Sequence, residues 1–192
     1  MMLGRTLHKG LRARLAVRFG LARVTRRFRS NEQGATAVEF ALVAVPFFAL
    51  MFAILETALA FFAGQALETS VRNVGRLIRT GQAQQLDLGP EAFKQRICDQ
   101  LFALVDCSKL TVDVRVYATF DINDLDPVDE DGNFVETGYG YEPGIGGQIV
   151  VVRAFYQWPT FVTKLGTDLS TLANGKHLLS ATVAFRNEPF PW

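Results

Sequence analysis

Gly34, Glu39 and Phe40 form the most distinctive short pattern of potentially functional residues in the chain. Glu39 lies five residues after Gly34, next to Phe40, at the start of a run that is almost wholly apolar. A lone carboxylate costs about 2.5–3.5 kcal/mol at the centre of a membrane span and less at its edge, where a cationic partner would offset more of the cost. Two interpretations of Glu39 follow, since its side chain can extend to lipid headgroups or bind a cation.

The remaining residues with reactive side chains are few and widely separated. The chain has only two histidines, His8 and His177, and no Cys-x-x-Cys or Cys/His cluster with metal-binding spacing. His177 lies beside Lys176 just before a predicted strand, and no nucleophile motif such as Gly-x-Ser-x-Gly lies near it. We therefore expect no enzymatic activity, no metal and no cofactor, with His177 exposed to solvent at the start of a strand.

The segment that must position Glu39 is long enough to cross a membrane. From Phe40 to Gly64 the only ionisable residue is Glu56, and these 25 residues exceed the roughly 20 that span a hydrocarbon core. A helix in a soluble core rarely has this length without polar residues. A cleaved secretory signal fits poorly, because more than 30 residues precede the apolar run. We therefore predict a transmembrane helix over residues 35–64.

The charge distribution predicts the orientation of this helix. Residues 1–34 contain nine Lys and Arg and one acid, whereas the remainder contains eleven basic and eighteen acidic residues, a net charge of 11 − 18 = −7. Because positive flanks stay on the cytoplasmic side, we expect residues 1–34 to form a cytoplasmic leader and residues 65–192 a periplasmic, extracytoplasmic domain. A basic leader beside a membrane segment favours contact with anionic lipid over contact with nucleic acid.

Glu56 is the second acid of the apolar run and lies 17 residues after Glu39. At 1.5 Å per residue this separation is about 25 Å along a helix, which places Glu56 near the far face of the bilayer. Its carboxylate then either faces the headgroups or packs against other helices in a bundle. Pro46 lies between the two acids and favours a kink, which membrane helices tolerate.

The basic leader, Gly34, Glu39, Phe40 and the apolar run together resemble the class III signal of type IV pilins and pseudopilins. The stretch GATAVEFALVAVPFFALMFAILETALAF is similar to the N-terminal helix of the TadE/TadG-like family of the Tad (tight adherence) pilus system. The stretches RLIRTGQAQ and LLSATVAFRNEPF resemble the TadE-like branch of that family. The lack of a long von Willebrand-type insertion argues against a TadG-like architecture.

This resemblance implies specific roles for the residues around Gly34. A prepilin peptidase would cut between Gly34 and Ala35 on the cytoplasmic side, where the missing Cβ of glycine suits a narrow protease cleft. Glu39, which with Phe40 belongs to the same signal, would pair with the freed amine of Ala35 on a neighbouring subunit. An acid near the position of Glu56 is also common in TadE-like helices.

The function implied by the resemblance is structural. We expect a pilin-like component, a pseudopilin or minor pilin, that is needed to assemble a Tad-type pilus in adhesion or secretion. Its partners would be the prepilin peptidase, other pilin-like subunits, the Tad assembly platform and membrane lipid. Its location would be the bacterial inner membrane or the pilus itself. The alternative is a membrane-anchored periplasmic binding domain that never enters a filament.

Helical periodicity continues beyond the predicted span. Apolar residues at helical spacing extend the first helix from Ala35 to about Thr80, and Gly81 is a suitable end for it. Pro90 is well placed in the first turn of a second helix, predicted over residues 89–108. The first helix would then belong partly to the membrane and partly to the following domain.

The rest of the chain predicts strands. Alternating or continuous apolar stretches at 110–120, 147–158 and 177–187 indicate a three-stranded antiparallel sheet packed on the first helix. In the first of these strands the alternation places Asp113 on the outward, polar face. Residues 122–147 contain the acidic stretch DPVDEDG, which does not fit a calcium-binding loop, and we expect a flexible polar connection there. The predicted fold class is α+β, of the pilin type.

Cys98 and Cys107 flank the end of the predicted second helix. In an oxidising compartment we expect them to form a disulfide, which would add roughly 2–3 kcal/mol of stability by the chain-entropy model. The alternative is a pair of free, partly buried thiols.

Overall fold

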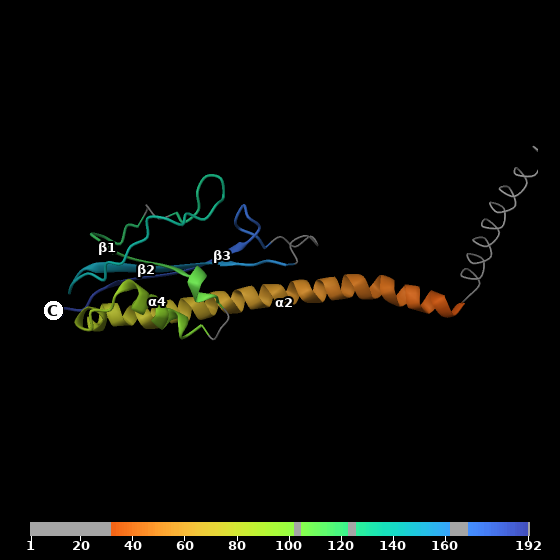
Figure 1. Ribbon diagram of the computed structural model, residues 1–192, viewed down its shortest axis with the longest axis horizontal. Coiled ribbons are helices and arrows are strands. Elements are labelled where there is room, and N and C mark those ends of the chain that lie inside the picture. Colours follow the sequence, from red (N-terminus) through yellow and green to blue (C-terminus); the bar gives the residue numbers. More distant parts are fainter. Residues whose placement is uncertain (1–31, 102–104, 123–125, 162–168, 192) are drawn as a thin grey trace, which may run out of the picture. The chain divides into compact units, whose positions relative to one another are not determined.

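The computed structural model of the chain describes residues 32–101, 105–122, 126–161 and 169–191 (Figure 1). The predicted leader, residues 1–34, lies almost entirely outside these described residues. The chain divides into two compact units, Met1–Leu50 and Met51–Trp192, and each is described by itself below.

Helix α2 spans Glu32–Arg79 and includes Pro46 in its interior. It begins three residues before the predicted start at Ala35, so Gly34 lies in its first turn. The helix ends as predicted, because Gly81 adopts a left-handed φ of 77° and its N–H donates to the carbonyl of Ile78 at 3.0 Å. Such a conformation is readily available to glycine and stops a helix. The long apolar N-terminal helix is therefore confirmed.

The second unit contains an antiparallel sheet of three strands, β1 (Thr111–Tyr117), β2 (Ile149–Trp158) and β3 (His177–Arg186). The strand order is β1-β2-β3, with both pairs antiparallel, so β2 is central as its continuous apolar sequence indicates. Figure 1 shows the sheet lying along the C-terminal part of α2. The α+β class predicted from the sequence is confirmed.

The core of this unit lies between α2 and one face of the sheet. Helix α2 contributes buried apolar residues that recur every three or four positions, as one face of a helix requires: Ala63, Leu67, Val71, Val74 and Ile78. The sheet contributes Val114, Val150, Val152, Ala154, Leu179 and Ala181. This packing explains why apolar residues continue along α2 beyond the predicted membrane span.

Short helices complete the core, namely α3 (Gln82–Gln85), α4 (Pro90–Cys98) and the 3-10 turn η1 (Cys107–Lys109). Helix α4 begins at Pro90 as predicted but ends at Cys98, well before residue 108. The N–H groups of Gln100 and Leu101 donate three residues back, to Ile97 and Cys98, and this tighter turn leaves Leu101 buried. The prediction of one long second helix was therefore wrong.

Residues 126–148 are not a simple flexible connection. The N–H of Val114 in β1 donates to the carbonyl of Gly140 at 2.9 Å, and the N–H of Glu142 donates to the carbonyl of Val114 at 2.8 Å. These bonds cover the free edge of β1, where unpaired backbone groups could otherwise pair with a strand of another chain. Phe134 and Tyr139 also stack at 5.9 Å and contact Phe155 on the outer face of β2.

Asp113 is consequently buried, with 1% of its surface exposed, although the alternation of β1 placed it on the solvent face. The prediction failed because the segment containing Gly140 covers the outer face and supplies polar partners. Asp113 accepts from the N–H of Gly140 at 2.8 Å and from Arg153 Nη2 at 2.7 Å. A buried carboxylate is tolerated when it is paired and hydrogen-bonded in this way.

Candidate functional site on helix α2

The residues predicted to form the processing signal lie at the exposed start of α2. Residues 34–40 are all exposed, and a Cβ added at Gly34 would meet no atom within 4 Å in the described part of the chain. The peptide bond between Gly34 and Ala35 lies in the first helical turn, where helices fray readily. Glycine lowers the helix preference further, by about 1 kcal/mol relative to alanine. Local unwinding can therefore present this bond in the extended form that a protease cleft accepts.

Glu39 lies one turn further along α2 and is exposed to the surroundings. Within the described residues its carboxylate has no hydrogen bond or ion pair. Phe40 beside it is 71% exposed. The carboxylate is thus open to a partner from another chain or to lipid headgroups.

Apolar side chains cover the first part of α2 on its surface. In the first unit the exposed ones are Val38, Phe40, Leu42, Val43, Val45, Phe47, Phe48 and Leu50. In the second unit they are Phe52, Ile54, Leu55, Leu59, Phe61 and Phe62. Residues Gly34–Arg79 contain a stretch that is long and apolar enough to cross a membrane. Such a surface is costly in water and is matched by the hydrocarbon of a bilayer.

Glu56 has an environment different from that of Glu39. Glu56 is only 8% exposed, and its carboxylate accepts a hydrogen bond from the backbone N–H of Phe161, a residue that follows β2. The two residues are 105 positions apart, and no periodicity in the sequence connects them. Sequence reasoning singled out Glu56 but missed Phe161, because a contact with a loop backbone leaves no residue-type signal.

A groove of about 260 Å³ lies between α2 and the start of β3. It is lined on the helix by Thr57, Ala60, Phe61, Gly64, Gln65 and Glu68, and on the other side by Leu169 and residues 177–180. His177 lines it and places Nδ1 2.8 Å from the carbonyl of Leu169, so this nitrogen carries a proton and donates. His177 lies at the start of β3 as predicted, but it is partly buried, whereas we expected it to be exposed to solvent. Among the described residues no group of His, Cys, Asp and Glu is arranged to hold a metal ion.

The most buried charges of the second unit lie on the outer face of the sheet. Arg153 bonds Asp113 through both Nε and Nη2, at 3.2 and 2.7 Å, and its guanidinium lies 5.4 Å from the ring centre of Phe155. Arg115 donates to Asp113 at 3.0 Å and also to the carbonyl of Gly138. This network holds residues 138–140 on β1. The carboxylate of Asp113 is paired with both arginines of this network, which indicates a structural role.

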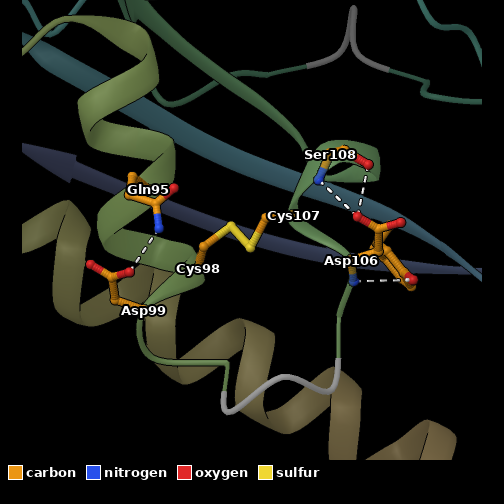
Figure 2. The surroundings of a disulfide bond; sticks show 7 residues. Gln95, Cys98, Asp99, Asp106, Cys107 and Ser108 are labelled. Carbon is orange, nitrogen blue, oxygen red and sulfur yellow. Dashed lines mark hydrogen bonds between the residues drawn. A yellow bond between two sulfur atoms is a disulfide. The ribbon is translucent and has the colours of Figure 1, made fainter.

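Cys98 and Cys107 are joined by a disulfide in the structure, and their Cα atoms are 5.9 Å apart (Figure 2). The bond connects the end of α4 to the start of η1. Next to it Asp106 accepts from the N–H and hydroxyl of Ser108, as Figure 2 shows, and pairs with Lys109 at 2.9 Å. The bonds from Lys109 and then Ser108 lower the pKa of Asp106 to about 2.

Comparison with known proteins supports the interpretation of the first helix. The model of the family described as TadE-like protein matches residues 34–76. The match starts at Gly34 and covers most of α2, so the resemblance to TadE-like proteins of the Tad pilus system is confirmed over this helix. No curated protein and no solved structure matches the chain significantly.

Proposed function

We propose that this protein is a pilin-like component, a pseudopilin or minor pilin, required to assemble a Tad-type pilus for adhesion or secretion. The observation that carries the proposal is the coincidence of three features at one end of α2. The match to TadE-like proteins begins at Gly34, the helix that follows exposes apolar residues, and Glu39 is open to a partner. A structural component needs no catalytic group, and the proposal includes that the protein is not an enzyme.

The proposed location is the bacterial inner membrane, with the leader in the cytoplasm and the folded domain in the periplasm. The exposed apolar surface of α2 supports membrane insertion. The nine Lys and Arg of residues 1–34 support the cytoplasmic position of the leader. The disulfide between Cys98 and Cys107 fits an oxidising periplasm.

The proposed mechanism has two steps that use residues at the start of α2. A prepilin peptidase first hydrolyses the peptide bond between Gly34 and Ala35, which removes the basic leader and creates an α-amine. The carboxylate of Glu39 on one subunit then pairs with the ammonium of Ala35 on another as helices associate beside the assembly platform. A charge-assisted hydrogen bond of this kind is stronger at the membrane edge than in bulk water.

A second candidate function is a membrane-anchored periplasmic binding domain outside any filament. The groove between α2 and β3 favours it, because its lining combines apolar residues with His177 and Glu68. The two candidates differ in processing, since only an assembling pilin-like subunit requires the amine of Ala35.

The test is the N-terminal mass of the chain produced together with a cognate prepilin peptidase and extracted from membranes. We expect the mature chain to begin at Ala35. The variant Gly34→Leu should remain uncut, because the leucine side chain would not fit the narrow cleft of the peptidase. The control Ala37→Leu adds the same side chain at another exposed position and should be cut normally. Intact Met1 ends on all the wild-type protein, with active peptidase present, would contradict the proposal.

A further inference from the structure

Phe161 belongs to the segment that follows β2, but it contacts the apolar part of α2. Its backbone N–H donates to the carboxylate of Glu56, which lies within the predicted span. Its side chain is 81% exposed, more than any other large apolar residue described in the chain. A soluble loop normally exposes polar side chains at such a position.

The helix around Glu56 exposes apolar residues on every side except the one that Phe161 approaches. Ala53, Glu56 and Ala60 form the buried side of this part of α2. The opposite sides carry side chains that are half exposed or more: Phe52, Ile54, Leu55, Leu59, Phe61 and Phe62. This surface is suited to hydrocarbon rather than water. A residue bonded to the same turn of helix therefore lies at membrane depth as well.

We propose that residues 158–161 enter the bilayer surface at the C-terminal end of the span, with the side chain of Phe161 in lipid. The segment has the chemistry of such a contact. Trp158, three residues before Phe161, is partly buried against the core and partly exposed, and tryptophan is typical of the membrane interface. Unbonded backbone N–H groups are costly in lipid, and two positions of this segment present none, because Pro159 has no N–H and that of Phe161 is bonded by Glu56.

The neighbouring polar groups fit the headgroup layer. Thr160 Oγ1 donates to the carbonyl of Gly175 at 2.5 Å, which fixes the segment against the turn before β3. In that turn Lys176 Nζ lies 3.4 Å from Gln157 Oε1, which places a cation beside the segment. Anionic lipid headgroups attract such a cation. On this account Glu56 is a positioning residue that holds the segment on α2.

This contact would fix the domain at the membrane surface at a second point besides the helix. The inference depends on α2 residues 52–62 lying in the bilayer. It does not depend on leader cleavage or on pilus assembly, so its test is separate from that of the proposed function.

The experiment places an environment-sensitive fluorophore on Phe161→Cys in the full-length chain. The protein is reconstituted in vesicles of phosphatidylcholine and phosphatidylglycerol, with the native disulfide kept oxidised. The matched control is Phe120→Cys, which replaces another exposed phenylalanine. Phe120 follows β1, whose last residue Tyr117 pairs with the first residue of β2, so it lies at the opposite end of the sheet from Phe161.

We expect a blue-shifted emission at position 161, quenching by spin-labelled lipid and little quenching by iodide. Position 120 should give the reverse pattern. Iodide quenching at 161 equal to that at 120 would overturn the proposal. Protection of 161 from both quenchers would also overturn it, because the side chain would then pack against another protein chain.

The role of Glu56 is tested in the same labelled protein. Glu56→Gln keeps an oxygen that accepts from Phe161, so lipid quenching at 161 should persist. Glu56→Ala removes the acceptor and should reduce lipid quenching and raise iodide quenching. Equal quenching in the two variants would show that Glu56 does not position the segment.

Discussion

The two acids of the apolar run differ in their partners, and this difference defines their roles. The carboxylate of Glu56 accepts a hydrogen bond from Phe161 of its own chain. Glu39 has no such bond within the described residues and is exposed on α2. Because a carboxylate in an apolar setting requires compensation, Glu39 is the one that needs a partner beyond the described residues, such as another subunit, water or lipid headgroups.

Replacing Glu39 by alanine should impair assembly more than membrane insertion. The variant loses an acid from an apolar span, so insertion should be unharmed. Loss of one partner of a buried pair costs about 3–5 kcal/mol, and less where water reaches the site. Even a loss of about 1.4 kcal/mol of binding free energy per subunit lowers an association constant tenfold.

The measurement compares membrane level, leader cleavage and co-purification of other pilin-like subunits. The control Glu68→Ala removes a partly exposed acid of α2 that pairs with Arg72 at 2.6 Å in the same helix. We expect reduced co-purification for Glu39→Ala alone, at normal membrane level. Equal co-purification of both variants would mean that Glu39 only reaches the headgroups.

Arg153 should be among the most sensitive positions for stability. Arg153→Met leaves Asp113 buried with Arg115 as its remaining ionic partner, so we expect a loss near the lower end of about 3–5 kcal/mol. The double variant Asp113→Asn/Arg153→Met should recover part of the loss, because the uncompensated charge is gone. Urea unfolding of the full-length chain in detergent measures both.

The control for this prediction is Arg186→Met, at an exposed position of β3, where surface changes stay within about 0.5 kcal/mol. If Arg153→Met were no more destabilising than Arg186→Met, the network around Asp113 would not hold residues 138–140 on the sheet.

At the scale of elements, the disulfide ties α4 to the strand that follows η1. Cys98→Ala/Cys107→Ala should lower the free energy of unfolding by roughly 2–3 kcal/mol, because the unfolded chain gains the entropy of an open loop. Urea unfolding should give the same value for this variant and for the reduced wild type. Rapid reaction of both wild-type cysteines with maleimide, without reductant, would show that the bond is absent in the exported protein.

The elements that could be predicted are those whose sequence repeats with a structural period. Apolar residues every three or four positions defined the second half of α2, and the continuous apolar sequence of β2 indicated its central place. Helix α4 was predicted too long, because turns of three residues also keep Leu101 in the core. Residues 126–148 have no period, so their packing on β1 was not predictable.

For the whole molecule, the fold class followed from local patterns, whereas the polar contacts that join distant segments did not. Asp113 and Arg153 are 40 positions apart, and Glu56 and Phe161 are 105 apart. Such pairs depend on strand register and loop path, which leave no signature in residue types. The stretch that starts at Gly34 could be singled out because its pattern is compact, and the family match begins at the same residue. Its role as a processing signal stays a prediction.

Pilus formation in the bacterium that produces this protein tests the proposed role in assembly. Deletion of the gene that encodes this protein should abolish the Tad-type pili seen by electron microscopy, and expression of the wild-type protein should restore them. The uncleaved variant Gly34→Leu should reach the membrane but fail to restore pili, whereas Ala37→Leu should restore them. Normal pili in the deletion strain, or full restoration by Gly34→Leu while its leader stays attached, would contradict a role as a processed assembly component.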